Sequence, residues 1–335
     1  MIGTSIEIAM QKLAQGEVVG MPTETVYGLA ARIDIPSAIE KIFKTKERPF
    51  FDPLIVHVHS IEQAQNLTTP WGEVTKSLAN KFWPGPLTMV LAKSDKVNDM
   101  ITSGLTSVGV RMPAHPVALE LLRAVNVPLA APSANKFGKT SPTSAEHVQA
   151  EFQKEDIYIL EGANCEIGIE STVLLVKEDS AKCELSILRQ GHVLQSEIEK
   201  FLKSEGLSFE FLTKIDKKES PGHLKHHYMP AIPLVIVNSC REESEIIEIV
   251  NQRLQELPDI VEDVKIVKPQ NGVQTFSELR LSPDPVVAAR ELYGKMRTVA
   301  EEGKDFIVFF KNDLHDGERW AAILDRLNKA ASLIL

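Results

Sequence analysis

The sequence predicts an α/β protein built from two domains. Strand-like and helix-like segments alternate along nearly the whole chain, an order that is typical of α/β folds. With 335 residues, the chain is long enough for two domains with cores of their own. The periodicity weakens between residues 209 and 233. We therefore expect a first domain over 1–208, an interdomain linker over 209–233 and a second domain over 234–335.

Local signals place the elements of the first domain. We expect strands at 18–21, 54–58, 87–92, 107–113, 157–161, 172–176 and 185–189. We expect helices at 6–16, 37–44, 115–125 and 193–204, with two more that begin at 60 and 143. Three of these helices have a hydroxyl followed three residues later by Glu or Gln, as in a capping box: Ser37 with Glu40, Ser60 with Gln63, and Thr143 with Glu146.

The second domain has a simpler pattern. Strands at 234–237, 264–267 and 305–310 alternate with helices at 242–257, 285–301 and 318–333. Three β-α units of this kind predict a small Rossmann-like sheet. The domain has no Gly-x-Gly-x-x-Gly segment, so we do not expect it to bind a dinucleotide.

Composition and charge limit the classes of function. A net charge of −9 argues against a protein covered in basic surface for tight, non-specific nucleic-acid binding. The three cysteines, Cys165, Cys183 and Cys240, form no Cys-x-x-Cys pair, which indicates neither a disulfide framework nor a zinc site. The N-terminal residues lack the layout of a signal peptide, and no apolar run approaches the ~20 residues that span a bilayer. We expect a cytoplasmic protein with no membrane partner.

Hydroxyl-rich loops recur at the predicted strand ends. Four such loops lie at 23–28, 103–107, 133–138 and 168–172, and the cations Lys46, Arg48, Arg111 and Arg189 lie beside them in the sequence. Loops at strand ends of α/β sheets bind ligands, and this combination predicts a pocket for anions and small polar groups. Such a pocket suits phosphoryl or nucleotidyl transfer, where positioning and charge neutralisation supply most of the catalysis.

Other interpretations of the same residues stay open at this point. A polar turn followed by a solvated Lys/Arg cluster would give a similar pattern at 23–48. His57 alternates with Val56 and Val58, so it faces away from them, either as a structural residue or into a cleft. Three histidines of the linker have poor spacing for a metal site and are better explained as solvated or packed side chains: His223, His226 and His227. No signature of a serine nucleophile, a Walker loop or a zinc protease is present.

A series of ordered motifs resembles one known family. The motifs of the YrdC-type domain are matched by Pro22-Thr23-Glu24-Thr25-Val26-Tyr27-Gly28-Leu29, Lys44-x-Lys46-x-Arg48-Pro49, Pro53-Leu54-Ile55-Val56-His57, Trp83-Pro84-Gly85-Pro86-Leu87-Thr88, Val110-Arg111-x-Pro113, Ala131-Pro132-Ser133-Ala134-Asn135, Glu170-Ser171-Thr172-Val173 and Leu188-Arg189-x-Gly191. The segments Ser220-Pro221-Gly222, His227-Tyr228-x-Pro230 and 322–331 resemble the longer, two-domain form, the threonylcarbamoyl-AMP synthases of tRNA modification.

The resemblance implies a fold and a reaction. The fold is a twisted mixed-sheet domain with a concave cleft, followed by a small three-layer Rossmann-like domain. The reaction converts L-threonine, bicarbonate and ATP to threonylcarbamoyl-AMP and pyrophosphate, with Mg²⁺ accompanying ATP. The product serves the modification of adenosine beside the anticodon of certain tRNAs. The implied partners are downstream threonylcarbamoyl-transferase proteins, with weak binding of tRNA or double-stranded RNA.

The resemblance also implies roles for individual residues. Lys46 and Arg48 would be catalytic and hold phosphates. L-Threonine would be surrounded by Thr25, His57, Arg111, Ala131 and Ser171. ATP would be lined by Arg48, Asp52, Ser107, Ser133, Asn135, Ser141 and Arg189, with Tyr228 of the linker closing over the nucleotide as part of a lid.

Two points qualify this assignment. Asp52 stands where the family commonly has Asn, and its charge near phosphates requires Mg²⁺ or a neighbouring cation. The alternative function is a non-catalytic RNA-binding or translation-associated module. That function would require aromatic side chains stacked along a basic track, whereas aromatic residues make up 6% of the chain.

Overall fold

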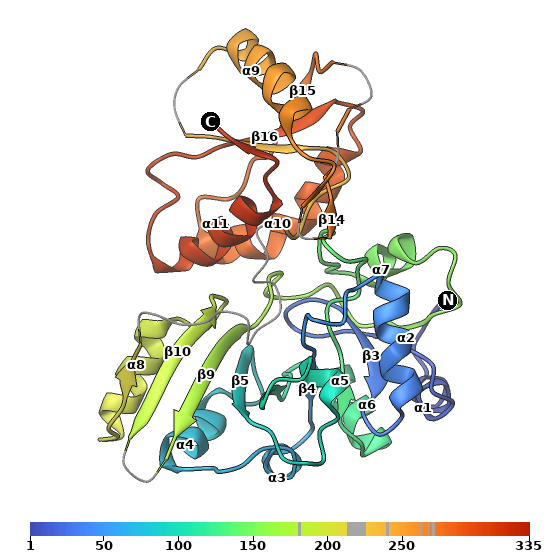
Figure 1. The fold of residues 1–335 in the computed structure, drawn as a ribbon, viewed down its shortest axis with the longest axis vertical. Coiled ribbons are helices and arrows are strands. Elements are labelled where there is room, and N and C mark those ends of the chain that lie inside the picture. The colour runs from blue at the N-terminus through green and yellow to red at the C-terminus, as the bar shows by residue number, and fades with distance from the viewer. Residues whose placement is uncertain (180–181, 213–225, 239–240, 262, 267, 270–271) are drawn as a thin grey trace. The chain divides into compact units, whose positions relative to one another are not determined.

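The computed structural model describes residues 1–179, 182–212, 226–238, 241–261, 263–266, 268–269 and 272–335. The chain forms two compact units (Figure 1). Unit 1 consists of Met1–Lys136 and Pro142–His223, and unit 2 of Phe137–Ser141 and Leu224–Leu335. Much of the predicted linker, together with His223 and Cys240, lies outside the described residues. Both units combine helices with sheets, which confirms the predicted α/β class.

Unit 1 is built on an 11-stranded mixed sheet with the order β1-β8-β2-β3-β7-β4-β6-β5-β9-β10-β11. Its strands are β1 Ile2–Gly3, β2 Val19–Met21, β3 Gly28–Arg32, β4 Ile55–His57, β5 Leu87–Ala92, β6 Ser107–Arg111, β7 Leu129–Ala130, β8 Tyr158–Leu160, β9 Thr172–Glu178, β10 Cys183–Arg189 and β11 Glu210–Phe211. Its helices are α1 Ile6–Ala14, α2 Pro36–Lys46, α3 Ile61–Gln65, α4 Glu73–Phe82, α5 Asp99–Thr102, α6 Pro116–Val125, α7 Ala145–Glu151 and α8 Gln195–Ser204.

The central strands have two different faces. Because side chains of a strand alternate, Val56, Met89 and Leu174 lie on one face, in the main core with side chains of α3, α4 and α8. A smaller apolar cluster consists of Ile55, Val90, Val173, Leu175 and Leu188. The alternation places His57 on the side of Ile55, as expected, and the register sets His57 beside Arg111. The site residues of β4 and β6 therefore share the face that carries the smaller cluster.

Three expectations about local structure were wrong. Strand β3 was not expected, because its small residues give no strand pattern, yet it pairs antiparallel with β2 and turns 22–27 into a hairpin loop. Helix α2 begins at Pro36 after Ile35, without a side-chain cap from Ser37, since proline already suits the first helical turn. Helix α7 is capped by Ser144, one residue after the expected Thr143. The Ser60 cap is confirmed.

Helix α4 was also not expected, and its cap explains why. Its N-cap residue is Gly72, which offers no side chain. The carboxylate of Glu178, at the end of β9, instead accepts hydrogen bonds from Val74 N at 2.9 Å, Thr75 N at 3.0 Å and Thr75 Oγ1 at 2.6 Å. A carboxylate stabilises a helix N-terminus, but here it comes from a distant part of the chain.

Replacing Glu178 by Ala is expected to lower the free energy of unfolding by about 1–2 kcal/mol, because the first turn of α4 loses its cap. Urea unfolding would measure the change. Glu73→Ala is the matched control, since Glu73 is exposed in the same turn and makes none of these three bonds. Equal losses in the two variants would contradict the capping role.

Unit 2 contains a parallel four-stranded sheet in the order β15-β16-β12-β17. Its strands are β12 Leu234–Val237, β15 Phe276–Glu278, β16 Phe306–Phe310 and β17 Leu333–Ile334, and its helices are α9 Glu243–Glu256, α10 Pro285–Ala300 and α11 Glu318–Ala330. Figure 1 shows α9 on one side of this sheet and α10 and α11 on the other. The three-layer, Rossmann-like arrangement is confirmed.

The expected strand at 264–267 does not belong to that sheet. Val264–Lys265 forms β14, which pairs with β13 (Ile260–Val261) in a separate hairpin, and Val267 lies outside the described residues. β15 takes its place in the sheet. Side chains far away in sequence hold the start of β15: the amide of Asn251 bonds both backbone groups of Val273, and Asp305 accepts from Thr275 N. Among the described residues of both units, no helix has the length and apolar character needed to span a membrane.

Candidate active site

The loop between β2 and β3 is buried and has hydrogen bonds within it. Thr23 Oγ1 accepts hydrogen bonds from Thr25 N and Val26 N, both at 3.2 Å, and lies 2.9 Å from Thr25 Oγ1. Thr23, Glu24 and Thr25 are at most 6% exposed. At Gly28, a Cβ atom would lie 3.1 Å from Ala131 Cβ, so glycine allows the two loops to approach closely. The alternative of a solvated polar turn is therefore wrong.

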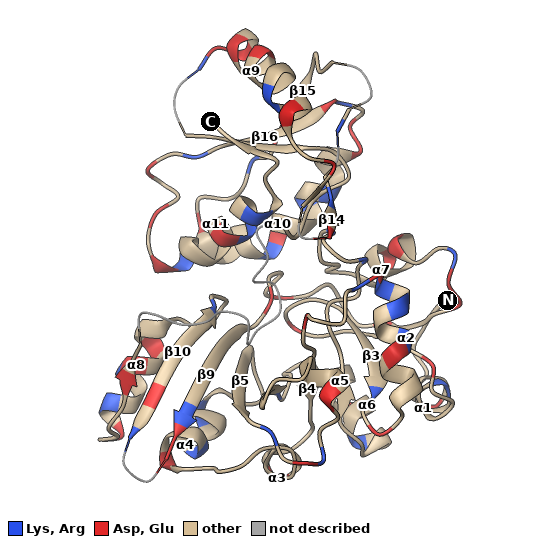
Figure 2. Cartoon of the chain, viewed as in Figure 1, with Lys and Arg blue, Asp and Glu red and all other residues tan. Residues whose placement is uncertain are grey.

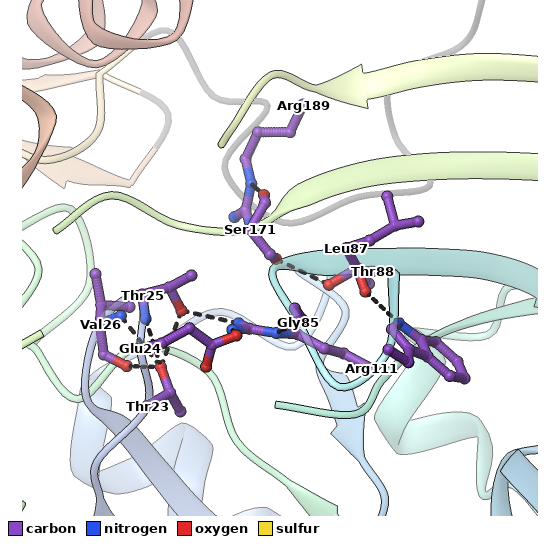
Figure 3. A network of polar contacts seen from close by, with 11 residues as sticks. Thr23, Glu24, Thr25, Val26, Gly85, Leu87, Thr88, Arg111, Ser171 and Arg189 are labelled. Carbon is purple, nitrogen blue, oxygen red and sulfur yellow. Dashed lines mark hydrogen bonds and ion pairs between the residues drawn. The ribbon is translucent and has the colours of Figure 1, made fainter. Parts of the chain in front are cut away.

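Arg111, at the end of β6, is the centre of a polar network (Figure 3). Its Nε donates to Gly85 O at 3.1 Å and its Nη1 to Thr25 Oγ1 at 2.8 Å. Its Nη2 forms an ion pair with Glu24 Oε1 at 2.6 Å. The guanidinium is 4% exposed, so all three groups fix it inside the protein. The contact with Glu24 shows that a guanidinium in this orientation can receive a carboxylate.

His57 lies next to Arg111 in the neighbouring strand and is 4% exposed. Burial lowers the pKa of His57 to about 3, and the positive charge of Arg111 contributes further. The imidazole is therefore neutral at pH 7. The pair presents one permanent cation and one neutral ring on the same face of the sheet.

The pKa of His57 predicts a loss of stability in acid. The unfolded chain takes up a proton near pH 6.5, whereas the folded chain does so only near pH 3, so stability falls as the pH drops through that window. At pH 4 the loss is about 3 kcal/mol relative to pH 7. In His57→Asn, the free energy of unfolding measured in urea is expected to change less between pH 7 and pH 4. The control His59→Asn, at a half-buried position, should leave it unchanged, and a steep profile in His57→Asn would contradict the assignment.

A second network joins two predicted residues, Ser171 and Arg189. Arg189 donates from Nε and Nη2 to Ser171 O, at 3.2 and 3.1 Å, and from Nη2 to Ser171 Oγ at 3.2 Å. Ser171 Oγ also lies 2.8 Å from Thr88 Oγ1 in β5. A Cβ at Gly191 would lie 2.4 Å from Thr172 N, so only glycine fits beneath this loop. Figure 3 shows this group together with the Arg111 network.

Lys46, the last residue of α2, is buried rather than solvated, with 1% of its surface exposed. Its Nζ donates to the backbone carbonyls of Ser133 and Asn135, which belong to the second hydroxyl-rich loop. Burial lowers the pKa of Lys46 well below its usual value, and the nearby charge of Arg48 lowers it further. Lys46 therefore anchors the loop that carries two of the predicted ATP ligands. Ala131, at the start of that loop, is held by a hydrogen bond from its N–H to Ile55 O at 3.0 Å.

Arg48 forms a buried ion pair with Asp52, with 2.9 Å between Nη2 and Oδ2. Its guanidinium also donates to Asp52 O at 3.1 Å and to Pro53 O at 2.8 Å. Arg48 is 7% exposed and Asp52 is fully buried. The neighbouring cation that Asp52 was expected to need is thus Arg48.

The remaining predicted residues lie elsewhere. Ser107 starts β6, at the opposite end from Arg111, and lines a pocket of about 290 Å³ together with residues of β5 and β9. Ser141 and Tyr228 belong to unit 2. The ring of Tyr228 is buried there, 5.8 Å from the ring of Tyr293 and 5.6 Å from the guanidinium of Arg326. His227 is also buried, with its ring 4.1 Å from that of Tyr228, so it is a packed side chain.

Sequence reasoning assigned no role to Glu24, Gly85 or Thr88, which the structure places in these networks. All three lie inside motifs that the sequence displays. The position of Glu24 between two threonines of a buried loop was the available signal.

The family models and relatives agree on one family. Residues 11–191 match the model described as "Telomere recombination" (Sua5_yciO_yrdC), and residues 193–332 match "Threonylcarbamoyl-AMP synthase, C-terminal domain". The chain is 36% identical to the threonylcarbamoyl-AMP synthase of Pyrococcus abyssi over 330 residues, which cover 97% of this chain and 94% of that protein. It is 38% identical to that of Bacillus subtilis over 324 residues, which cover 95% and 90%.

A solved structure extends this agreement to the fold. P. abyssi Sua5 in complex with L-threonine has a TM-score of 0.77 and 32% sequence identity, with 100% of this chain and 99% of that chain covered. A doubly substituted variant of the same protein has a TM-score of 0.80, with 100% and 97% covered. The chain therefore belongs to the family of two-domain threonylcarbamoyl-AMP synthases.

Proposed function

We propose that the chain is an L-threonylcarbamoyladenylate synthase, which converts L-threonine, bicarbonate and ATP to threonylcarbamoyl-AMP and pyrophosphate for tRNA modification. The observation that carries the proposal is the buried Arg111 guanidinium, held by Thr25 and Glu24 beside a neutral His57. An oriented, desolvated guanidinium suits the carboxylate of an amino acid. The P. abyssi relative whose structure matches over the whole chain was solved with L-threonine, which supports the same ligand here.

The threonine site then lies on the face of the unit 1 sheet that carries the smaller apolar cluster with Ile55 and Val90. Arg111 binds the carboxylate, while Thr25, Ser171 and the backbone of Ala131 surround the rest of the molecule. His57 contributes a neutral ring, because a second cation beside Arg111 would be unfavourable. After the ammonium group of threonine has lost a proton to solvent, the neutral amine attacks CO2, which bicarbonate supplies by losing hydroxide, and a carbamate forms. The hydroxide and the second amine proton leave as water. A carbamate oxygen then attacks the α-phosphate of ATP and displaces pyrophosphate.

No protein nucleophile is needed for this transfer. Cys165 is a buried thiol that senses the charges of Glu24 and Arg111, and burial raises its pKa to about 12, so it is protonated at pH 7. Catalysis then rests on positioning and on neutralisation of phosphate charge, which is the role proposed for Lys46 and Arg48. Both side chains bond to protein acceptors in this structure, so ATP binding would exchange part of those contacts for phosphate oxygens.

Mg²⁺ enters this proposal with ATP. Within the described part of the chain, no group of three or more His, Cys, Asp or Glu residues could hold a metal ion. The carboxylate of Asp52 is neutralised by Arg48. An ion that arrives with ATP would be held mainly by the phosphates, and it would neutralise charge on the leaving pyrophosphate.

The ATP roles of Ser107, Ser133, Asn135, Ser141, Arg189 and Tyr228 remain predictions, as do a cytoplasmic location, the downstream transferase partners and weak binding of tRNA. The alternative of an RNA-binding module would require a basic track with stacking aromatics. Figure 2 shows acidic and basic residues interspersed over the helices of both units, which gives that alternative no support.

The test is pyrophosphate release from ATP, with threonine and bicarbonate omitted in turn. We expect release only when both are present. Folded protein that releases pyrophosphate in no combination would overturn the proposal and favour a relative without the chemistry. Release that does not depend on threonine would indicate a different acceptor.

A further inference from the structure

The carboxylate of Glu24 is an incompletely paired charge inside unit 1. Glu24 is 6% exposed, and its backbone carbonyl accepts a hydrogen bond from Ile167 N at 2.9 Å, which fixes the residue in its loop. Oε1 lies 2.6 Å from Arg111 Nη2 in an ion pair without hydrogen-bond geometry, and neither Oε1 nor Oε2 has a hydrogen-bond partner among the described residues. Leaving a carboxylate oxygen buried without a partner is unfavourable, so such an oxygen suggests a ligand group that is absent from the free protein.

One full positive charge, that of Arg111, faces the carboxylate of Glu24 among the described residues. Arg111 is the cation that contacts it. Cys165 is a neutral thiol whose pKa is raised first by burial and then by the charge of Glu24. The pKa of His115 is lowered by burial, and Glu24 opposes that shift. Both neighbours therefore lie close enough to sense the carboxylate, but neither supplies a second full positive charge.

An amino acid presents two opposite charges, and the residues assigned to threonine account for only one of them. Thr25, His57, Arg111, Ala131 and Ser171 offer a guanidinium, hydroxyls, a neutral ring and backbone, but no carboxylate for the α-ammonium group. Figure 3 shows the Glu24 carboxylate beside the end of the Arg111 side chain. A zwitterion placed against this pair would complete an alternating series of charges, with its carboxylate on Arg111 and its ammonium on Glu24.

We propose that Oε2 of Glu24 binds the α-ammonium group of the amino-acid substrate, so that the buried Glu24–Arg111 pair recognises a zwitterion. This inference rests on the proposed function, because it assumes that an amino acid binds beside Arg111. It assigns Glu24 a substrate-binding role in addition to its contact with Arg111. It also predicts that the site rejects the 2-hydroxy acid of the same shape. A hydroxyl group carries no positive charge, so it cannot replace the ammonium group as the partner of Glu24.

The test compares two ligands by isothermal titration calorimetry: L-threonine and (2S,3R)-2,3-dihydroxybutanoate, in which a hydroxyl replaces the ammonium group. The wild-type chain is expected to bind threonine about 10- to 100-fold more tightly. In Glu24→Gln, threonine affinity should fall by a similar factor, while affinity for the hydroxy acid stays within about twofold. Glu161→Gln is the charge-matched control, since Glu161 is exposed, and it should leave both affinities unchanged.

Each other outcome has a defined meaning. If Glu24 serves only to hold Arg111, Glu24→Gln will weaken both ligands in parallel, and the inference is overturned. If the wild-type chain binds neither ligand, the proposed function itself fails, and the inference fails with it. If Glu24→Gln does not fold, Glu24→Asp replaces it: a preference for threonine that survives at reduced strength supports the inference, and an unchanged threonine affinity contradicts it.

Discussion

Replacing Arg111 by Met is expected to reduce threonine- and bicarbonate-dependent pyrophosphate release by about 10³-fold, because the guanidinium that positions the threonine carboxylate is lost. The same change should lower the free energy of unfolding by about 3–5 kcal/mol, because Glu24 then remains buried without its cation. Pyrophosphate release and urea unfolding measure the two effects separately. Methionine is chosen because it keeps much of the volume of the arginine stem.

The double variant Arg111→Met/Glu24→Gln separates stability from activity. Removing the charge of Glu24 should restore much of the lost stability, because no unpaired charge stays buried. Turnover should stay as low as in Arg111→Met. Recovery of turnover in the double variant would mean that Arg111 acts only by neutralising Glu24, and would contradict a direct role in threonine binding.

The sequence predicted the elements whose signals are local. The observed bounds of β5 agree with the expected residues 87–92, and the Ser60 cap of α3 is as expected, because both depend on neighbouring residues. The structure differs where distant residues decide the outcome. α4 depends on Glu178, about a hundred positions later, and β15 depends on Asn251 and Asp305. No local pattern contains those contacts.

In the candidate site, too, the sequence predicted the types of residue but not the contacts between distant residues. The spacing of hydroxyls and cations predicted a pocket for polar, anionic ligands, and the structure joins Thr25 with Arg111 and Ser171 with Arg189. A sequence gives the type of each residue but not the atoms that it meets after folding. It therefore could not show that Glu24 pairs with Arg111 or that Lys46 reaches two backbone carbonyls.

Replacing Lys46 by Met is the second change with a large expected effect. Two backbone carbonyls, one buried and one partly buried, would lose their donor, which should lower the free energy of unfolding by about 2–4 kcal/mol. The loop with Ser133 and Asn135 would lose its anchor, so the KM for ATP should rise at least about tenfold. The affinity for L-threonine should change little, since Ala131, the residue of the proposed threonine site in that loop, is held separately by its bond to Ile55 O. Lys44→Met is the matched control, because Lys44 is exposed on the same helix.

The protonation of Lys46 gives a sharper test of its contact with ATP. Its pKa is lowered by burial, so the unfolded chain binds the proton more tightly, and stability rises with pH between the lowered value and the usual one. In either protonation state the amine has at least two N–H bonds for the two carbonyls. Phosphate oxygens beside the amine would favour its charged form, so at pH values between the lowered pKa of Lys46 and the usual lysine value, ATP binding should be accompanied by proton uptake. Calorimetry in buffers of different ionisation enthalpy should detect this uptake in the wild type and not in Lys46→Met. Equal uptake in both would place the phosphates away from Lys46.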